Sequence, residues 1–519
     1  MAVRAPNQPP PLRDVNVVAG NAPLLEAVRR EGAAWSEDDL VSFGAELGGE
    51  PLAWGRLANE HPPVLRTHDR YGERIDEVEF HPAYHQLLGL GVGRGVHALS
   101  WTEGRAGAHV ARAASFMALA QVEQGVGCPL SMTHAAVPAL RADPALAAEW
   151  EPLLTSRSYE PQLAPAREKR GALCGMAMTE RQGGSDVRAN ETEARPAGDG
   201  EATLHGHKWF CSAPMSDAFL VLAQAPAGLT CFLVPRVLPD GTRNELRLER
   251  LKDKHGNRSN ASAELRLEGA WSRRVGEEGR GVATIIEMVV HTRLDCVLGS
   301  AALMRQAVAE ATHHCAHRSA FGRTLIEQPL MLNVLADLCV ESEAATVSAL
   351  RLARAFDEGD ELRRVATAVL KYHVCKRAVA VVAEALECLG GNGYVEESGL
   401  PRLYRESPLN AIWEGSSNVQ CLDVLRALRR QPEAGERFLA ELEPADRAAA
   451  EGALAEADEG TARRLVEALA VALQGTLLDR HGDPAVAAAF RARRGAAAFG
   501  TLPAGLPLAS IVARHRPLL

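Results

Sequence analysis

The sequence contains no long apolar segment. Eighteen or more apolar residues never run together, and the N-terminal stretch has an early arginine, Arg4, with no apolar core behind it. A membrane-spanning helix needs about 20 predominantly apolar residues, and a signal peptide needs an apolar core. We therefore expect neither a membrane span nor a signal peptide.

Cysteine pairs are also missing. The 10 cysteines are scattered singly from Cys128 to Cys421, without CxxC pairs and without the density of a disulfide scaffold. Isolated thiols of this kind are typical of a reducing compartment. We expect reduced cysteines and a cytoplasmic protein.

The chain has no phosphate-binding loop of a known pattern and no excess of positive charge. The stretch from Gly89 to Gly95, GLGVGRG, matches neither GxGxxG nor GxxxxGK[ST], and no clear strand precedes it. The formal net charge is -9, which argues against a protein that coats nucleic acid over its whole surface. Any contact with nucleic acid needs a local basic patch.

The composition is that of an ordinary globular protein, and the predicted secondary structure changes along the chain from helical to β-rich and back to helical. The 519 residues, 46% hydrophobic and 24% charged, are enough for two to four domains. The first third is mostly helix by its periodicity, with helices expected over 23–32, 37–47 and 107–125. Short β-rich runs follow over 173–275, at 204–212, 219–224, 230–235 and 245–251. Long helical segments then return at 282–318, 330–357 and 361–389, and after Glu414.

One carboxylate, Glu414, lies between an indole and a run of small residues in the segment from Asn410 to Arg426. The residues after Gly415 are good helix N-caps, so Glu414 is expected just outside a helix start. Gly415 lets a ligand approach the chain closely, and a carboxylate placed there can take a proton from a bound substrate. The alternative is an acidic residue in a loop.

Two stretches of the β-rich region suit a planar ligand. In MTERQGGSDV, Thr179 and Ser185 flank a pair of glycines. The later run HGHKWFCS supplies Trp209 and Phe210 as apolar faces and Ser212 as a hydroxyl. Together they suit a flavin ring better than a phosphate. The alternative is that GGSD is a hairpin turn and the aromatic residues belong to the core.

Two further patterns lie in the helical segments. Glycines at Gly390 to Tyr394, GGNGY, would end a helix and leave room for a pyrophosphate, to which Arg318 could supply charge. His313 and His317 are four apart on a helix, a spacing that can bind a metal, but no third ligand is evident. We predict no metal site.

Five motifs in a fixed order carry a resemblance: MTE..GSDV, KWF.S, HRSAFG, GGNGY and WEGSSN. Over residues 107–430 the chain resembles the acyl-CoA dehydrogenase superfamily of flavoproteins. The segment from Thr67 to His85, the RLERLKDKHGNRSNAS run and the extensions at both ends resemble one branch, the AidB-like proteins of the bacterial alkylation response.

The resemblance implies an α+β fold with an N-terminal helical domain, a middle β-barrel, a C-terminal four-helix bundle and an extra helical C-terminal region. We accordingly expect domains over 1–170, 171–280, 281–432 and 433–519. It also implies FAD as cofactor, an acyl thioester or related small molecule as substrate and a homotetramer. The alternative function is a flavoprotein that mainly binds DNA, with weak or vestigial dehydrogenase activity.

Residue roles follow from the same resemblance. Glu414 matches the base that removes an α-proton while the β-hydrogen leaves as hydride to the flavin, and Arg293 matches an arginine near that base. The residues that would contact the cofactor are Met178, Thr179, Gly184, Ser185, Phe210, Cys211, Ser212, Arg318, Trp413, Gly415, Ser416 and Asn418.

Some positions depart from the family pattern. Phe210 stands where a tryptophan is usual, and Trp413 replaces the commoner tyrosine before the base. Glu387 stands where a glutamine near the pyrophosphate is usual, and a carboxylate facing phosphate is unfavourable unless it is neutralised or turned away. Gln328 is one residue short of the family spacing.

Charge is distributed unevenly over the C-terminal region. Residues 433–482 carry five arginines against eleven acidic residues, whereas residues 483–519 carry five arginines against Asp483 alone. We predict that any DNA contact is to phosphates with little sequence choice, because no base-reading motif is present. The candidate DNA residues are Arg426, Arg429, Arg430, Arg491, Arg493 and Arg494; their alternative role is a solvated helix face.

Overall fold

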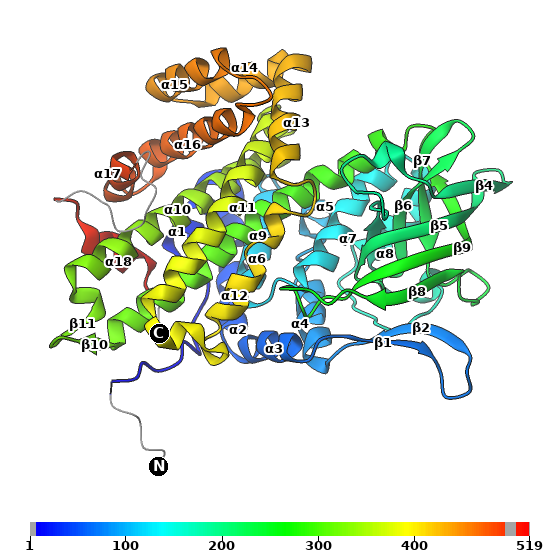
Figure 1. Ribbon diagram of the computed structural model, residues 1–519, viewed down its shortest axis with the longest axis horizontal. Coiled ribbons are helices and arrows are strands. Elements are labelled where there is room, and N and C mark those ends of the chain that lie inside the picture. Colours follow the sequence, from blue (N-terminus) through cyan, green and yellow to red (C-terminus); the bar gives the residue numbers. More distant parts are fainter. Residues whose placement is uncertain (1–6, 494–504, 518–519) are drawn as a thin grey trace. The chain divides into compact units, whose positions relative to one another are not determined.

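The computed structural model describes residues 7–493 and 505–517. The chain divides into two compact units, whose helices and strands are labelled in Figure 1. The barrel unit comprises Ala53–Gly104 and Glu123–Thr292. The helical unit comprises Met1–Leu52, Arg105–Val122 and Arg293–Leu519. Each unit is therefore assembled from segments that are far apart in the sequence.

The barrel unit is built on a seven-stranded sheet that closes on itself. Neighbouring strands follow the order β3-β6-β4-β5-β9-β7, β8 pairs with β9, and an additional pairing of β6 with β7 closes the ring. This confirms the predicted middle β-barrel. The strands are β3 (Cys174–Ala177), β4 (Glu193–Gly198), β5 (Glu201–Ser212), β6 (Ala218–Ala225), β7 (Gly228–Pro235), β8 (Leu246–Leu251) and β9 (Ser262–Val275).

The sequences of strands β6 and β7 are almost continuously apolar, because both faces of these strands are buried against other parts of the protein. Helices α7 (Gly127–Leu140) and α8 (Pro144–Leu154) pack on one side, where Trp150 joins Leu220 and Leu222 in a single core cluster. Phe219 and Val221, which alternate with those leucines, face a second cluster inside the barrel. Strands covered on both faces lose the apolar–polar alternation.

Several β elements escaped the sequence pattern, among them β9 and a hairpin in the first third. Strand β9 is the longest strand among the described residues, with 14 residues, and its outward positions carry charged side chains such as Arg266 and Glu268 that hide its apolar face. The predicted helical third contains a hairpin of β1 (Val64–His68) and β2 (Arg74–Glu79). The carboxylate of Asp69 accepts hydrogen bonds from the backbone N–H groups of Tyr71 and Glu73 and thereby fixes its turn. Polar hairpins of this kind carry a weak periodic signal.

The helical unit is organised around four long helices. They are α9 (Gly281–His317), α10 (Pro329–Asp357), α11 (Leu362–Cys388) and α13 (Ser417–Arg430), close to the predicted spans. The residues of α9 before Arg293 belong to the barrel unit. Smaller helices of the helical unit include α1 (Ala22–Val28), α2 (Glu37–Leu47), α6 (Ala108–Val122) and α12 (Leu400–Glu406). The remaining helices of the first third are α3 (Glu50–Glu60), α4 (Pro82–Gly93) and α5 (Leu99–Thr102).

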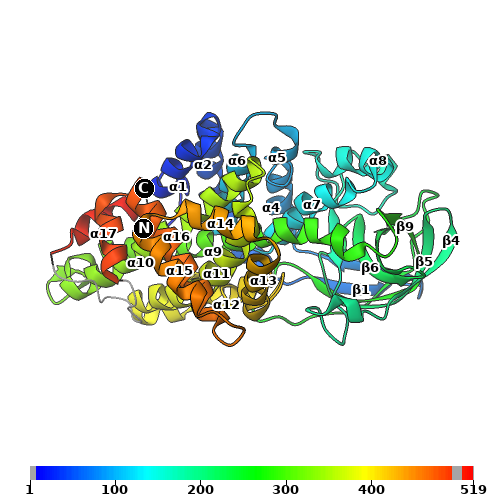
Figure 2. The same ribbon diagram turned by 90° about the horizontal axis from the view of Figure 1, so that it is seen from above.

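A C-terminal set of helices adds to this unit: α14 (Pro432–Glu441), α15 (Pro444–Ala455), α16 (Ala462–His481), α17 (Pro484–Arg493) and α18 (Leu508–His515). Figure 2 shows α14, α15 and α16 near α13 in the same unit. They confirm the predicted extra helical region.

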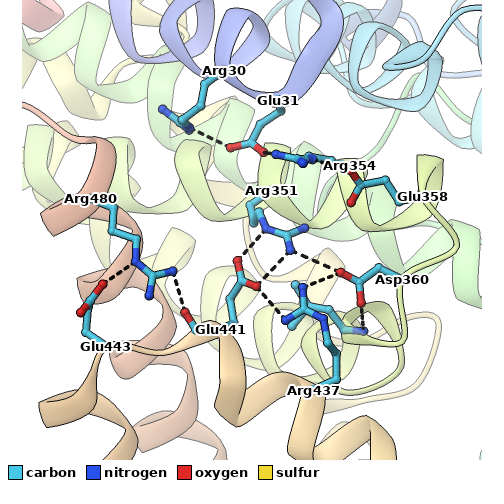
Figure 3. Close-up of polar contacts among 11 residues, drawn as sticks. Arg30, Glu31, Arg351, Arg354, Glu358, Asp360, Arg437, Glu441, Glu443 and Arg480 are labelled. Carbon is cyan, nitrogen blue, oxygen red and sulfur yellow. Dashed lines mark hydrogen bonds and ion pairs between the residues drawn. The ribbon is translucent and has the colours of Figure 1, made fainter.

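Ion pairs join these added helices to α10 (Figure 3). Arg351 of α10 pairs with Glu441 of α14 at 2.8 Å, and the same glutamate pairs with Arg437 at 2.9 Å. Asp360 bridges Arg351 at 3.4 Å and Arg437 at 2.6 Å, and Arg480 of α16 pairs with Glu443 at 2.5 Å. A connected, partly buried network of this kind stabilises more than isolated surface pairs do. It fastens the C-terminal helices to the bundle.

No helix in the part of the chain that the structure describes is both long and apolar enough to cross a lipid bilayer.

Candidate active site

In the helical unit, Glu414 lies in a short loop whose backbone is in the left-handed region, which non-glycine residues rarely adopt. Its φ angle is 58° and that of Gly415 is 92°. Helix α13 begins at Ser417 with Ser416 as its N-cap, so Glu414 stands just before the helix, as predicted. A non-glycine residue with positive φ costs on the order of 1 kcal/mol and persists where its surroundings fix it. At Gly415 a Cβ would lie 2.7 Å from the Gln420 amide nitrogen, so this position needs glycine.

Three side chains fix the loop by binding its carbonyl oxygens. Arg293 of α9 donates from Nε to the Glu414 carbonyl at 3.0 Å. Lys371 of α11 donates to the carbonyls of Trp413 at 2.7 Å and Gly415 at 2.5 Å. Gln420 donates to the carbonyls of Glu414 at 3.2 Å and Gly415 at 2.9 Å. The structure thus brings Arg293 and Glu414 together, as the sequence predicted.

A half-buried carboxylate, Asp423, supports Arg293 from α13. It accepts from Arg293 Nη1 at 2.9 Å and from Arg364 Nη2 at 3.1 Å. Burial alone would raise the pKa of Asp423, but the charges and hydrogen bonds of Arg293 and Arg364 outweigh it and hold that pKa below its ordinary value. Asp423 therefore stays ionised and holds the Arg293 guanidinium against the loop.

In the barrel unit, the residues predicted for a flavin meet at the end of β5. The Trp209 backbone N–H donates to the Thr179 carbonyl at 2.9 Å, so the MTERQGGSDV loop lies beside the strand. The Phe210 ring is 52% exposed, which excludes it from the core. The Ser212 hydroxyl lies 3.1 Å from the Ser262 hydroxyl of β9. An apolar ring bordered by hydroxyls is a surface that fits a planar heteroaromatic ligand.

A buried ion pair fixes both stretches. Lys208 and Glu180, each 0% exposed, pair at 2.7 Å. Burial would raise the pKa of Glu180, but the Lys208 charge and the hydrogen bonds from Lys208, Thr192 and the Glu191 N–H bring it down to about 2. Glu180 follows Thr179 in the chain and Lys208 precedes Trp209, so this pair holds the loop and the strand end together.

The glycine pair forms a tight turn. Glu180 and Gly183 make an isolated bridge, which agrees with the hairpin-turn interpretation of GGSD. A Cβ at Gly184 would lie 2.5 Å from the Thr179 hydroxyl oxygen, so glycine is required for the loop to pass there. Neither Thr179 nor Ser185 uses its hydroxyl in a hydrogen bond to another described residue. Both hydroxyl groups are therefore available for hydrogen bonds to a ligand.

The other predicted cofactor residues have mixed surroundings. Met178 is half-buried against the core cluster of α7 and α8. Trp413 donates from its indole to Asn410 Oδ1 at 2.8 Å, and Asn418 accepts from Arg463 at 2.8 Å. Arg318 donates to the backbone carbonyl of Asn7 at 2.6 Å.

Structure and prediction disagree for two side chains. Cys211 is 0% exposed inside the barrel, where burial raises the pKa of its thiol to about 12, so its side chain does not face a ligand on the strand surface. Arg491 is bound by Asp446 at 2.6 Å and Asp479 at 2.5 Å, so its charge is neutralised within the helical unit. The Arg493 side chain and Arg494 lie outside the described residues. The Arg491 correction arises from partners that are distant in sequence.

The remaining predicted residues either contact backbone carbonyl oxygens or lie on the surface. His313 lies 2.8 Å from the Pro10 carbonyl and His317 lies 2.8 Å from the His313 carbonyl, so both rings contact backbone oxygens. Glu387 is exposed. Arg426, Arg429 and Arg430 are exposed on α13.

Sequence reasoning missed Lys371, Gln420, Asp423 and Arg364 as supports of the Glu414 loop. A weak signal for one of them was present. Lys371 is a single charge within the otherwise apolar stretch VATAVL–YHVC of α11, and such an isolated charge on a buried helix face commonly has a specific partner.

Comparison with known proteins identifies the family and the fold. Three family models match in order: the adaptive response protein AidB N-terminal domain over residues 7–161, the acyl-CoA dehydrogenase middle domain over 175–270 and the acyl-CoA dehydrogenase C-terminal domain over 279–429. The solved structure of Caenorhabditis elegans ACDH-11 in complex with C11-CoA aligns with a TM-score of 0.84 at 26% identity, covering 99% of this chain and 93% of that one. The fold is that of the acyl-CoA dehydrogenases.

Sequence relatives narrow this class to one branch. AidB of Escherichia coli is 52% identical over 433 residues, which are 82% of this chain and 80% of that protein. The Caenorhabditis elegans acyl-CoA dehydrogenase family member 11 is 32% identical over 75% of this chain and 66% of its own length. The chain belongs to the AidB branch of the acyl-CoA dehydrogenase family, a family of oxidoreductases that use FAD.

Proposed function

We propose that this protein oxidises an acyl thioester or a related small molecule, with Glu414 as the catalytic base. The observation that carries this proposal is the Glu414 loop, which three bundle side chains hold in a left-handed backbone conformation. Positive φ at a non-glycine residue marks a position whose side chain is aimed by its surroundings. A carboxylate fixed in this way is suited to accept the α-proton of a bound substrate.

FAD, when bound, supplies the acceptor for the substrate's β-hydride. We propose that Thr179, Ser185 and Ser212 hold it with hydroxyl groups and that Phe210 covers one face of its ring. None of these residues forms an obvious covalent link, so the cofactor is bound by contacts alone. Met178, Gly184, Ser416 and Asn418 complete the proposed contacts, with Trp413 and Gly415 beside the base and Arg318 for the pyrophosphate.

The purified protein is therefore expected to be yellow and to release FAD on acid precipitation. Under nitrogen, an acyl thioester that is a substrate is expected to bleach its absorbance near 450 nm, because the flavin takes up the hydride. A colourless protein that cannot be reconstituted with FAD would refute the cofactor assignment. A yellow protein that no acyl thioester bleaches would refute the substrate class alone.

We further propose a homotetramer in the cytoplasm. Large apolar side chains of the helical unit are exposed, with Phe321 at 98%, Tyr394 at 84% and Leu330 at 83%. A contiguous patch of exposed apolar side chains can mark an interface between chains, and we propose that role for these residues. Light scattering is expected to give four times the chain mass of 55.6 kDa, and a monomer mass would contradict the proposal. The 10 free thiols support a reducing compartment.

DNA contact is a second proposal, in line with the alkylation response after which the branch is known. Arg426, Arg429 and Arg430 are exposed on α13 and can bind phosphates, and of these Arg426 also lies 4.0 Å from Asp423. Arg491 is instead neutralised by Asp446 and Asp479. Changing the three α13 arginines to Ala is expected to weaken duplex binding and to lower the slope of log affinity against log salt by roughly 3 units.

A control variant changes three arginines of the barrel unit, Arg167, Arg195 and Arg250, whose side chains are 68%, 63% and 62% exposed. It removes the same charge and is expected to keep the wild-type slope. Equal slopes for the two variants would show that α13 is not the site.

A further inference from the structure

Lys371 is a buried lysine whose hydrogen bonds all run to the loop that carries Glu414. The residue lies on α11 and is 1% exposed. Its Nζ binds the carbonyl oxygens of Trp413 at 2.7 Å and Gly415 at 2.5 Å. Among the described residues, no carboxylate lies within ion-pair distance of this ammonium group. Keeping a buried cation with only neutral partners is costly, so a role beyond packing would account for it.

The two carbonyls that Lys371 binds lie on either side of Glu414. Between them, the Glu414 carbonyl is bound by Arg293 at 3.0 Å and Gln420 at 3.2 Å. All three consecutive carbonyls therefore point to bundle side chains. With the peptide planes on both sides of Glu414 fixed, its Cα–Cβ direction is fixed as well.

Arg293 and Lys371 differ in what holds them. Arg293 is oriented by the Asp423 carboxylate at 2.9 Å, so its guanidinium has a partner besides the loop. Lys371 has the loop alone, and its charge also acts on the thiol of Cys296, where it opposes the increase in pKa that burial causes. Replacing this lysine would therefore weaken the hold on the loop without breaking an ion pair.

We propose that Lys371 is a positioning residue that holds the Trp413–Gly415 backbone so that the Glu414 carboxylate is aimed at the substrate α-carbon. The proposal rests on the proposed role of Glu414 as base. It assigns to α11 a function in the reaction that buried packing residues on the same helix do not have.

The test compares Lys371→Met with Leu370→Ala in the flavin-loaded protein. Leu370 is the preceding residue, 0% exposed, so its truncation destabilises α11 without touching the loop carbonyls. In Lys371→Met, we expect hydrogen exchange of the segment 411–421 to rise by about tenfold or more, because the loop opens locally. The rate constant of flavin reduction by an acyl thioester is expected to fall by about 100-fold, as a misplaced catalytic group requires. Substrate affinity and flavin content stay within about threefold, because no contact to either is removed.

Lys371→Gln provides a second variant, because it keeps a neutral donor but is too short to reach both carbonyls. We expect it to reduce the rate by about tenfold, and it decides the question if Lys371→Met does not fold. Unchanged exchange of segment 411–421 in a folded Lys371 variant would overturn the proposal. An equal slowing in Leu370→Ala at a matched loss of melting temperature would overturn it too.

Hydrogen exchange separates this proposal from the one on which it rests. If an acyl thioester reduced the flavin of the Glu414→Gln variant at the wild-type rate, Glu414 would not be the base. The exchange of segment 411–421 would still report whether Lys371 holds the loop.

Discussion

Replacing Glu414 by Gln is expected to slow flavin reduction by an acyl thioester by about 10²- to 10⁴-fold, the usual contribution of a general base. The amide has nearly the shape of the carboxylate but cannot accept a proton. The loop is held through its backbone carbonyls by Lys371, Arg293 and Gln420, so the substitution leaves those contacts in place. Bound FAD and substrate affinity should remain close to wild type. Anaerobic stopped-flow absorbance with a proven substrate measures the rate.

Glu433→Gln is a matched control, because Glu433 is exposed shortly after α13 and loses the same charge. Its rate should equal that of the wild type. Flavin reduction in Glu414→Gln at the wild-type rate would exclude Glu414 as the base. Loss of FAD from that variant would instead show that the substitution disturbs the site as a whole.

Replacing Lys208 by Met is expected to lower the free energy of unfolding by about 3–5 kcal/mol, because it leaves the Glu180 carboxylate buried without its cation. Both groups are 0% exposed in the ion pair. The pair also joins the Thr179 loop to the end of β5, so a variant that folds should bind FAD more weakly. Thermal unfolding with and without added FAD measures both effects.

The double variant Lys208→Met with Glu180→Leu is the control, because it removes both charges and leaves no lone carboxylate. It should recover much of the stability lost in Lys208→Met. Full stability of the single variant would show that the pair is dispensable. The recovery should be incomplete, because Glu180→Leu also removes the acceptor of the Glu191 N–H and of the Thr192 hydroxyl.

The same pair predicts a pH dependence. The pKa of Glu180 is about 2 in the folded protein, below the ordinary value of 4.5. A depressed carboxyl pKa stabilises the fold at pH values above the unfolded pKa, and this contribution is lost as the pH falls from about 4.5 towards 2. The wild type should therefore lose stability in that interval faster than the double variant does, as measured by denaturant unfolding at a series of pH values.

The positions of most helices and strands depend on local sequence patterns, which is why they could be predicted from the sequence. The strands near 204–212, 219–224 and 230–235 and the long helices α9, α10 and α11 follow from apolar periodicity, and the structure places them within a few residues. Glu414 was found because glycine and three N-capping residues follow it, a pattern that places it before a helix. The motif order similarly indicated the family. Strand β9 was missed because charged residues occupy its outward face.

Tertiary structure decided what surrounds these residues, because hydrogen bonds and ion pairs form between positions that no local pattern connects. Arg293 and Glu414 are 121 residues apart, and Lys371 reaches the carbonyl of Trp413 across 42. Arg491 belongs to a basic segment in the sequence, yet Asp446, 45 residues away, neutralises it. The sequence alone thus predicted a candidate base, Glu414, and where the helices and most strands lie. Only the fold determined which side chains hold that base and which arginines keep a free charge, since the free energy of a charged or polar group depends on the partners that folding brings to it.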